Sequence, residues 1–222
     1  MQPCTAAARP RSQAPSSLGS TEVRLVPFYF AAAGFATVAP DYLGLGVSPL
    51  PHPYLQGSSE ASATLDLLAP AAHLAARDGL LVNHDVLVSG FSQGGQAAMA
   101  IGHALQQQSG PWRLAALAPI AGPYDLAGTE LPAALDPLRV DQSTVTADLA
   151  FLVTSWKAWY GLYRDPHEVF TPAYAGRVEG LFDGRHDLAQ IAASLPADPA
   201  ALFQPQLLQW FAHPTGQLAT AL

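Results

Sequence analysis

Residues 85–95 read DVLVSGFSQGG, a short apolar run followed by glycines on both sides of a serine. Residues 85–89 predict a buried strand, and the small-residue segment 94–107 predicts a helix. The motif G-x-S-x-G at 90–94 therefore lies where a strand turns into a helix, which is the setting that this motif requires. So tight a turn holds its serine in a strained backbone conformation and leaves no room for side chains at Gly90 and Gly94.

Ser92 is the candidate nucleophile of this motif. Its hydroxyl would stand at the carboxyl edge of the sheet, where open α/β sheets place their active sites. Gln93 opens the following helix, and its backbone N–H is a candidate oxyanion donor for the charge that develops on a carbonyl oxygen during acyl transfer. The alternative is a coincidental match in a glycine-rich chain, with Ser92 acting only as a helix cap.

Short apolar runs alternate with helical patterns on both sides of this motif, up to residue 125. Predicted strands span residues 35–39, 85–89 and 113–120, and predicted helices span residues 23–33, 58–79 and 94–107. The second helix begins at Ser58 or Ser59, with Glu60 close behind. Alternation of this kind is typical of a parallel sheet, so we expect an α/β fold. Beyond residue 125 the patterns are helical, at 149–163, 188–195 and 200–211, with a strand over 151–154 as an alternative.

Composition narrows the class of protein. The chain has 222 residues, 50% of them hydrophobic, and a formal net charge of −7, so it offers no basic surface for nucleic acid or an anionic membrane. We expect a soluble chain without a transmembrane segment, because no apolar run is long enough to span a bilayer. Residues 1–20 show no signal-peptide core, and the single cysteine, Cys4, leaves the compartment undecided. Metal-ligand spacing is absent too, so we expect no metal and no cofactor.

Five blocks in a fixed order carry a family resemblance: GF at 34–35, APDYLGLG at 39–46, HPYL at 52–55, GFSQGG at 90–95 and AGPYDL at 121–126. Together they resemble the α/β-hydrolase superfamily and, within it, the secretory-lipase-like serine esterases. The resemblance covers roughly residues 14–211. It implies a partial α/β-hydrolase fold, mainly a parallel sheet with a C-terminal helical cap. The corresponding domains are an N-terminal arm (1–20), a partial core (21–125) and a cap or lid (126–222).

The same resemblance implies a function. It implies a carboxylic-ester hydrolase of lipid catabolism that forms an acyl-enzyme on Ser92, with a small-molecule ester or a lipid as substrate. It also suggests secretion, although no signal peptide is visible. An apolar cap above a shortened sheet would leave apolar surface exposed, so we expect self-association.

A serine nucleophile needs a histidine base and an acid, which follow it along the chain in the order acid, then histidine. The resembling family places both after strands that follow the cap, and the sequence shows no such strands. We therefore expect a chain truncated at both ends, in which a fluorophosphonate labels Ser92 slowly or not at all. The acid candidate is Asp125, with capping of the turn as the alternative. The triad histidine is unidentified; the candidates, each with a surface role as the alternative, are His167, His186 and His213.

Two other functional interpretations stay open. One is a catalytically incomplete fragment, or a non-catalytic binding protein, that keeps the hydrolase fold. The other is a peptidase or a thioesterase of the same fold, since both share acyl-enzyme chemistry.

Overall fold

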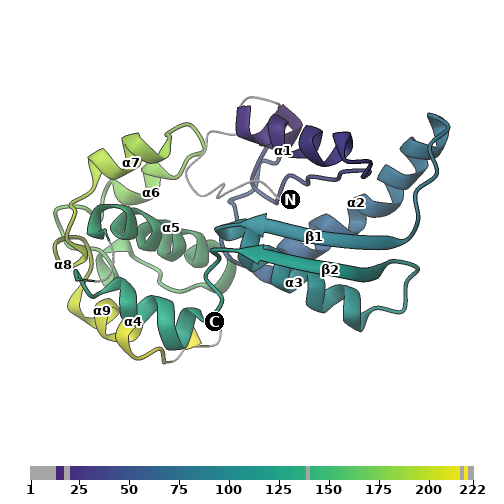
Figure 1. Ribbon diagram of the computed structural model, residues 1–222. Coiled ribbons are helices and arrows are strands. Elements are labelled where there is room, and N and C mark those ends of the chain that lie inside the picture. Colours follow the sequence, from purple (N-terminus) through teal and green to yellow (C-terminus); the bar gives the residue numbers. More distant parts are fainter. Residues whose placement is uncertain (1–13, 18–20, 139–140, 216–217, 220–222) are drawn as a thin grey trace. The chain divides into compact units, whose positions relative to one another are not determined.

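The computed structural model describes residues 14–17, 21–138, 141–215 and 218–219. They form two compact units, the first ending at Pro123 and the second beginning at Tyr124. The first unit (Figure 1) contains η2 (Pro15–Ser17), α1 (Thr21–Ala32), α2 (Gly57–Arg77), β1 (Asp85–Phe91), α3 (Gln93–Gln107) and β2 (Arg113–Ile120). The second contains η3 (Leu126–Glu130), α4 (Leu131–Ala134), α5 (Gln142–Tyr160), η4 (Pro166–Glu168), α6 (Val178–Leu181), α7 (Leu188–Ser194), α8 (Pro199–Leu202) and α9 (Pro205–Ala212). The domain assignment made from the sequence, including the role of a cap, stays a prediction.

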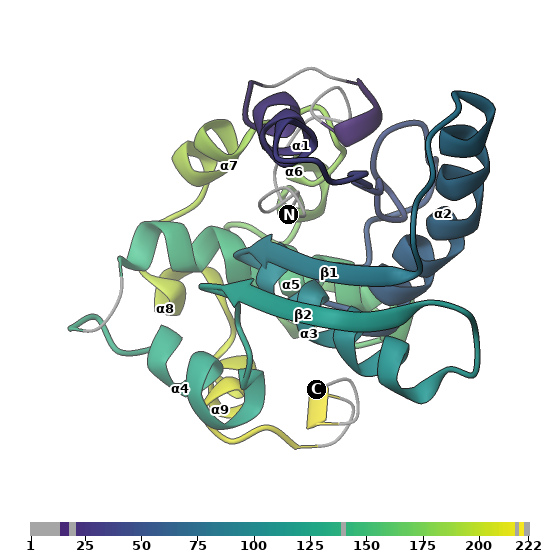
Figure 2. The ribbon, with the colours of Figure 1, turned by 45° about the vertical axis from the view of Figure 1, so that its right-hand side comes forward.

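The described strands of the first unit form a parallel pair. β1 and β2 run side by side in the same direction (Figure 2), with Asp85 paired to Arg113 and Phe91 paired to Ile120. An ion pair of 2.7 Å between the same Arg113 and Asp85 closes the start of the ladder. A parallel pair requires a crossover, and α3 supplies it while packing against both strands. The expected α/β character of the fold is thereby confirmed.

The core of the first unit lies between the strands, α3 and α2. On α3 the buried side chains recur every three or four residues, so a single helix face meets the sheet and α2. The buried members of this core are Ala14, Tyr42, Leu45, Ala61, Val88, Ala97, Ala98, Ile101 and Leu105. α2 approaches α3 closely near Gly57, where an added Cβ would lie 2.9 Å from the Ala100 methyl group. α3 thus packs against α2 as well as against both strands.

One predicted strand is wrong. Residues 35–39 form no strand, and Phe35 is 44% exposed rather than buried. A strand is defined by its ladder partner, and within the described ranges β1 and β2 pair only with each other. The predicted β–α–β–α–β series is therefore reduced to β1–α3–β2, preceded by helices. The strand predicted over 85–89 does form, and it continues to Phe91.

One face of the parallel pair carries exposed apolar side chains. Leu87, Phe91 and Ile120 are 54%, 42% and 41% exposed. Parallel sheets ordinarily have both faces covered, so such exposure is uncommon. The self-association expected from exposed apolar surface stays a prediction.

The second unit is helical and is built around α5, with α6, α7 and α8 packed against it and α4 packed against α9. Asp141 caps the start of α5 and Gly161, in the left-handed conformation, caps its end. The helix predicted there is confirmed, and the alternative strand over 151–154 is wrong. The helix predicted over 200–211 is two helices, because the chain is extended at Phe203 and Gln204 before Pro205 starts α9. No described helix is long and apolar enough to cross a membrane.

Candidate functional site

Ser92 occupies the turn between β1 and α3 with a backbone that few non-glycine residues adopt. Its φ is 56° and its ψ is −121°. Such a conformation costs on the order of 1–3 kcal/mol and persists only where the surroundings enforce it. The Ser92 N–H donates to the Ile120 carbonyl at 3.0 Å, and the Ser92 carbonyl accepts from the Gly95 N–H at 2.8 Å. The end of β2 and the first turn of α3 thus hold Ser92 from both sides.

Two glycines make this turn sterically feasible. A Cβ added at Gly90 would lie 2.0 Å from the Gly94 carbonyl oxygen, and one added at Gly95 would lie 2.7 Å from the Ile120 carbonyl oxygen. Both distances are too short for any side chain. Glycine is therefore required at positions 90 and 95 by the close approach of strand, turn and helix, and the expected lack of room at Gly94 stays a prediction.

Gln93 follows the serine and is the first residue of α3. N–H groups in the first turn of a helix have no acceptor within the helix, and the helix dipole makes this end favourable for negative charge. The Gln93 side chain is buried, and the residue is only 1% exposed. Its Nε2 donates to Glu60 Oε1 at 2.7 Å and lies 2.8 Å from His52 Nε2.

His52 is buried beside this amide, with both of its ring nitrogens engaged. Its Nδ1 lies 2.7 Å from the Leu43 carbonyl oxygen, which can only accept, so Nδ1 carries the proton and Nε2 accepts from Gln93. Burial lowers the pKa of His52 from 6.5 to about 4 and keeps the ring neutral at neutral pH. The ring stacks on that of Tyr42 at 6.1 Å. His52 is therefore not available as a base for Ser92.

Glu60 lies on the buried face of α2 and is fully inaccessible to solvent. Its Oε2 has no hydrogen-bond partner among the described residues. Burial raises the pKa of Glu60 from 4.5 to about 8, partly offset by the hydrogen bond from Gln93. Sequence reasoning treated Glu60 as a first-turn helix residue and missed this contact. The available signal was its phase, since Glu60 precedes the buried Thr64 and Leu68 by four and eight positions.

Asp125, the acid candidate, belongs to the second unit, where it caps η3. It accepts from the Gly128 N–H at 3.0 Å and from the Thr129 hydroxyl at 2.7 Å. These bonds, the one from Thr129 first, lower the pKa of the exposed Asp125 carboxyl. Its capping role is thereby observed, and its role as a triad acid stays a prediction.

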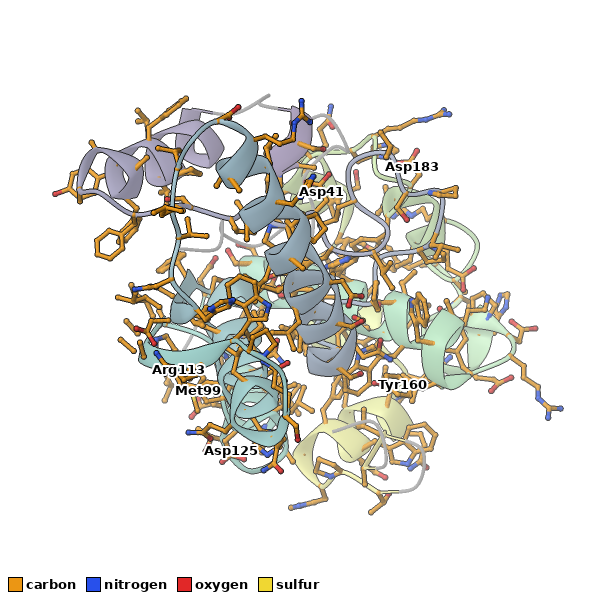
Figure 3. The ribbon with its side chains drawn as sticks, turned by 90° about the vertical axis from the view of Figure 1, so that its right-hand side faces the viewer. Asp41, Met99, Arg113, Asp125, Tyr160 and Asp183 are labelled. Atoms are coloured by element: carbon orange, nitrogen blue, oxygen red, sulfur yellow. The ribbon has the colours of Figure 1, made fainter. Side chains whose placement is uncertain are left out.

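Asp41 lies in the loop after α1 and, like Asp125, is labelled in Figure 3. It accepts from the N–H of Ser16 at 3.0 Å and also from the hydroxyl of that serine. Asp41 therefore ties this loop to η2.

The three histidines proposed as bases lie in the second unit and have local contacts. His167 Nδ1 lies 2.9 Å from Asp165, His186 Nδ1 lies 2.9 Å from Asp183, and His213 terminates α9. His167 and His186 are therefore each paired with an acidic residue of their own unit. The described residues also contain no cluster of three or more His, Cys, Asp or Glu that could hold a metal ion.

Comparison with solved structures places this architecture among hydrolases. A proposed hydrolase from Legionella pneumophila is 29% identical over 95% of this chain and 56% of that protein, with a TM-score of 0.84. The rice cell wall degrading esterase LipA from Xanthomonas oryzae is 29% identical over the whole of this chain and 59% of that protein, with a TM-score of 0.82. A ligand-bound form of LipA is 31% identical over 83% of this chain and 50% of that protein, with a TM-score of 0.68.

The chain thus has the fold of the hydrolase segments that it matches, and it spans a little over half the length of the first two relatives. It matches no protein-family model and no curated protein.

Proposed function

We propose that the chain is a serine carboxylic-ester hydrolase of the α/β-hydrolase type, and within it of the secretory-lipase-like class. The observation that carries the proposal is the backbone of Ser92, with φ 56° and ψ −121° between a parallel strand and a helix. A serine held in this way presents its hydroxyl outward at the end of the sheet. The proposed substrate is an ester of a small molecule or a lipid.

The proposed reaction has two halves. Ser92 Oγ attacks the ester carbonyl carbon while a general base takes the hydroxyl proton, and the Gln93 N–H donates to the oxygen that becomes negatively charged. The tetrahedral intermediate then breaks its bond to the alcohol oxygen, which leaves with the proton, and an acyl-Ser92 ester remains. Water attacks that ester in the same way and releases the carboxylic acid and the free serine.

Similarity to solved hydrolases supports the general class of this proposal. Activity on rice cell walls belongs to LipA, and we extend only ester hydrolysis to this chain. The same elbow serves peptidases and thioesterases, which differ from esterases in the leaving group, so an assay with esters, amides and thioesters distinguishes the three classes.

Hydrolysis of p-nitrophenyl esters of graded acyl length tests the proposal. We expect the chain to hydrolyse them, Ser92→Ala to fall to the uncatalysed rate, and Ser89→Ala to retain activity. Ser89 is the matched control, because it lies on β1 and its hydroxyl donates to the Ala118 carbonyl. Unchanged hydrolysis in Ser92→Ala would overturn the proposal, and preference for an aminoacyl amide would replace the esterase class with a peptidase.

A non-catalytic binding protein is the second candidate. The observation that favours it is His52, the histidine hydrogen-bonded to the neighbour of Ser92, whose two ring nitrogens are both engaged. Saturable binding of a p-nitrophenyl ester by the wild-type chain, with no p-nitrophenol released above the uncatalysed rate, would support this candidate and overturn the enzyme.

A further inference from the structure

Behind the elbow, the Gln93 side chain is held in a buried polar chain that the proposed reaction does not itself use. This row of hydrogen bonds runs from the Leu43 carbonyl through His52 to the Gln93 amide and on to Glu60. The donor–acceptor distances are 2.7, 2.8 and 2.7 Å. It connects a loop, the first residue of α3 and the first turn of α2. The two protons of Gln93 Nε2 are therefore assigned to two acceptors, His52 Nε2 and Glu60 Oε1.

This row of hydrogen bonds can form only when His52 is neutral. A neutral His52 presents a bare Nε2 to Gln93, whereas a protonated ring would place a donor against a donor. Burial, which lowers the pKa of His52 to about 4, maintains the neutral form. The ring of Tyr42 stacks on the His52 ring, and the centre of the Tyr54 ring lies 6.3 Å from that of His52. Burial and, to a smaller extent, the charge of Glu60 hold the pKa of Tyr42 well above its usual value.

We propose that Glu60 and His52 are positioning residues that clamp the Gln93 side chain and so fix the direction of the Gln93 backbone N–H toward the oxyanion. This inference rests on the proposed function, because it assigns a reason to the residue beside Ser92. The elbow restricts the backbone of Gln93, and the hydrogen bonds of its buried amide restrict its side chain. Together they leave the N–H little freedom to turn away from the forming charge.

A clamp of this kind predicts a kinetic signature that simple core packing does not. Losing an acceptor for Gln93 Nε2 should lower the rate of the chemical step, because misalignment of an oxyanion donor affects the transition state more than the bound ground state. The affinity for the substrate should stay the same as in wild type. Loss of core packing alone would instead lower stability without changing the labelling rate of the folded fraction.

The experiment measures inactivation of the chain by a fluorophosphonate, with kinact and KI determined separately. For Glu60→Leu we expect kinact to fall by about 10- to 100-fold with KI unchanged. Glu60→Gln keeps an acceptor for Gln93 and should restore most of kinact. Asp66→Leu is the matched control, since it removes a carboxylate from an exposed position of the same helix.

Gln93→Met provides a second variant should Glu60→Leu fail to fold. It keeps the backbone N–H and removes the clamped amide, so kinact should again fall while KI holds. Wild-type kinact in folded Glu60→Leu or Gln93→Met would overturn the inference. A wild-type chain that is never labelled at Ser92 would instead overturn the proposed function.

The hydrogen bonds of the Gln93 side chain can also be tested by a measurement that needs no enzymatic activity. In wild type, the two side-chain amide protons of Gln93 should exchange slowly in NMR spectra, and they should exchange fast in Glu60→Leu. Fast exchange in the wild type would overturn the clamp even in a chain that carries out no hydrolysis.

Discussion

Replacing Glu60 by glutamine should change how the stability of the chain depends on pH. The folded pKa of Glu60 is raised from 4.5 to about 8 by burial, so its contribution to stability is complete below pH 4.5 and is lost as the pH rises through 8. His52 acts in the opposite sense: its pKa falls from 6.5 to about 4, so its contribution is complete above pH 6.5 and is lost as the pH falls toward 4.

Between pH 4.5 and 6.5 the stability lost at Glu60 as the pH rises is offset by the stability gained at His52. Above pH 6.5 only the loss at Glu60 continues. One proton changes the unfolding free energy by about 1.4 kcal/mol per pH unit, so wild type should lose about 2 kcal/mol between pH 6.5 and 8 from this site. Glu60→Gln retains the acceptor for Gln93 and removes the titration. The stability difference between the variant and wild type should therefore grow by about 3 to 4 kcal/mol between about pH 5 and about pH 8.

Urea unfolding of the two proteins, followed by far-ultraviolet circular dichroism at both pH values, measures this difference. Subtracting wild type from variant cancels the titrations that the two chains share. A difference that stays constant within about 1 kcal/mol would refute a buried, uncompensated Glu60 carboxyl, because even a tenfold change in its proton affinity on folding corresponds to about 1.4 kcal/mol.

Other variants test neighbouring features. Gly90→Ala places a Cβ 2.0 Å from a backbone carbonyl oxygen and should destabilise the chain by about 3 kcal/mol or prevent folding, whereas Gly176→Ala, with nothing within 4 Å, should be neutral in thermal unfolding. His52→Gln keeps an acceptor for Gln93 and should preserve fluorophosphonate kinact better than His52→Leu; equal rates would exclude a role for this hydrogen bond. Leu87→Ser should reduce concentration-dependent association in sedimentation velocity, because Leu87 is 54% exposed on the sheet face, and a wild-type chain that stays monomeric at high concentration would exclude association through it.

The elbow could be predicted from the sequence because its determinants are local. Glycines two residues before and after Ser92, an apolar run and a small-residue helix all fall within one segment, and each restricts the backbone independently. The predicted strand over 35–39 fails for the opposite reason. Its composition suits a strand, but pairing depends on a neighbour elsewhere, which local composition does not specify.

The phase of Glu60 with Thr64 and Leu68 could indicate a buried position, but no sequence pattern identifies the partners of its carboxyl group. Gln93 is 41 positions from His52 and 33 from Glu60, and polar residues at such separations carry no periodic signal. A glutamate in the first turn of a helix is ordinary, so the position of Glu60 in α2 did not by itself indicate a buried contact. Only the packing of α2 against α3 brings its carboxyl to the Gln93 amide.

Peptide mapping after fluorophosphonate treatment tests the assignment of Ser92 most directly. The chain and its Ser92→Ala variant are treated alike, digested and examined by mass spectrometry. We predict a phosphonyl group on Ser92 in the wild-type chain, accumulating slowly, and none at any other serine or in the variant. An unmodified Ser92, or equal modification of the variant, would contradict the assignment of Ser92 as the nucleophile.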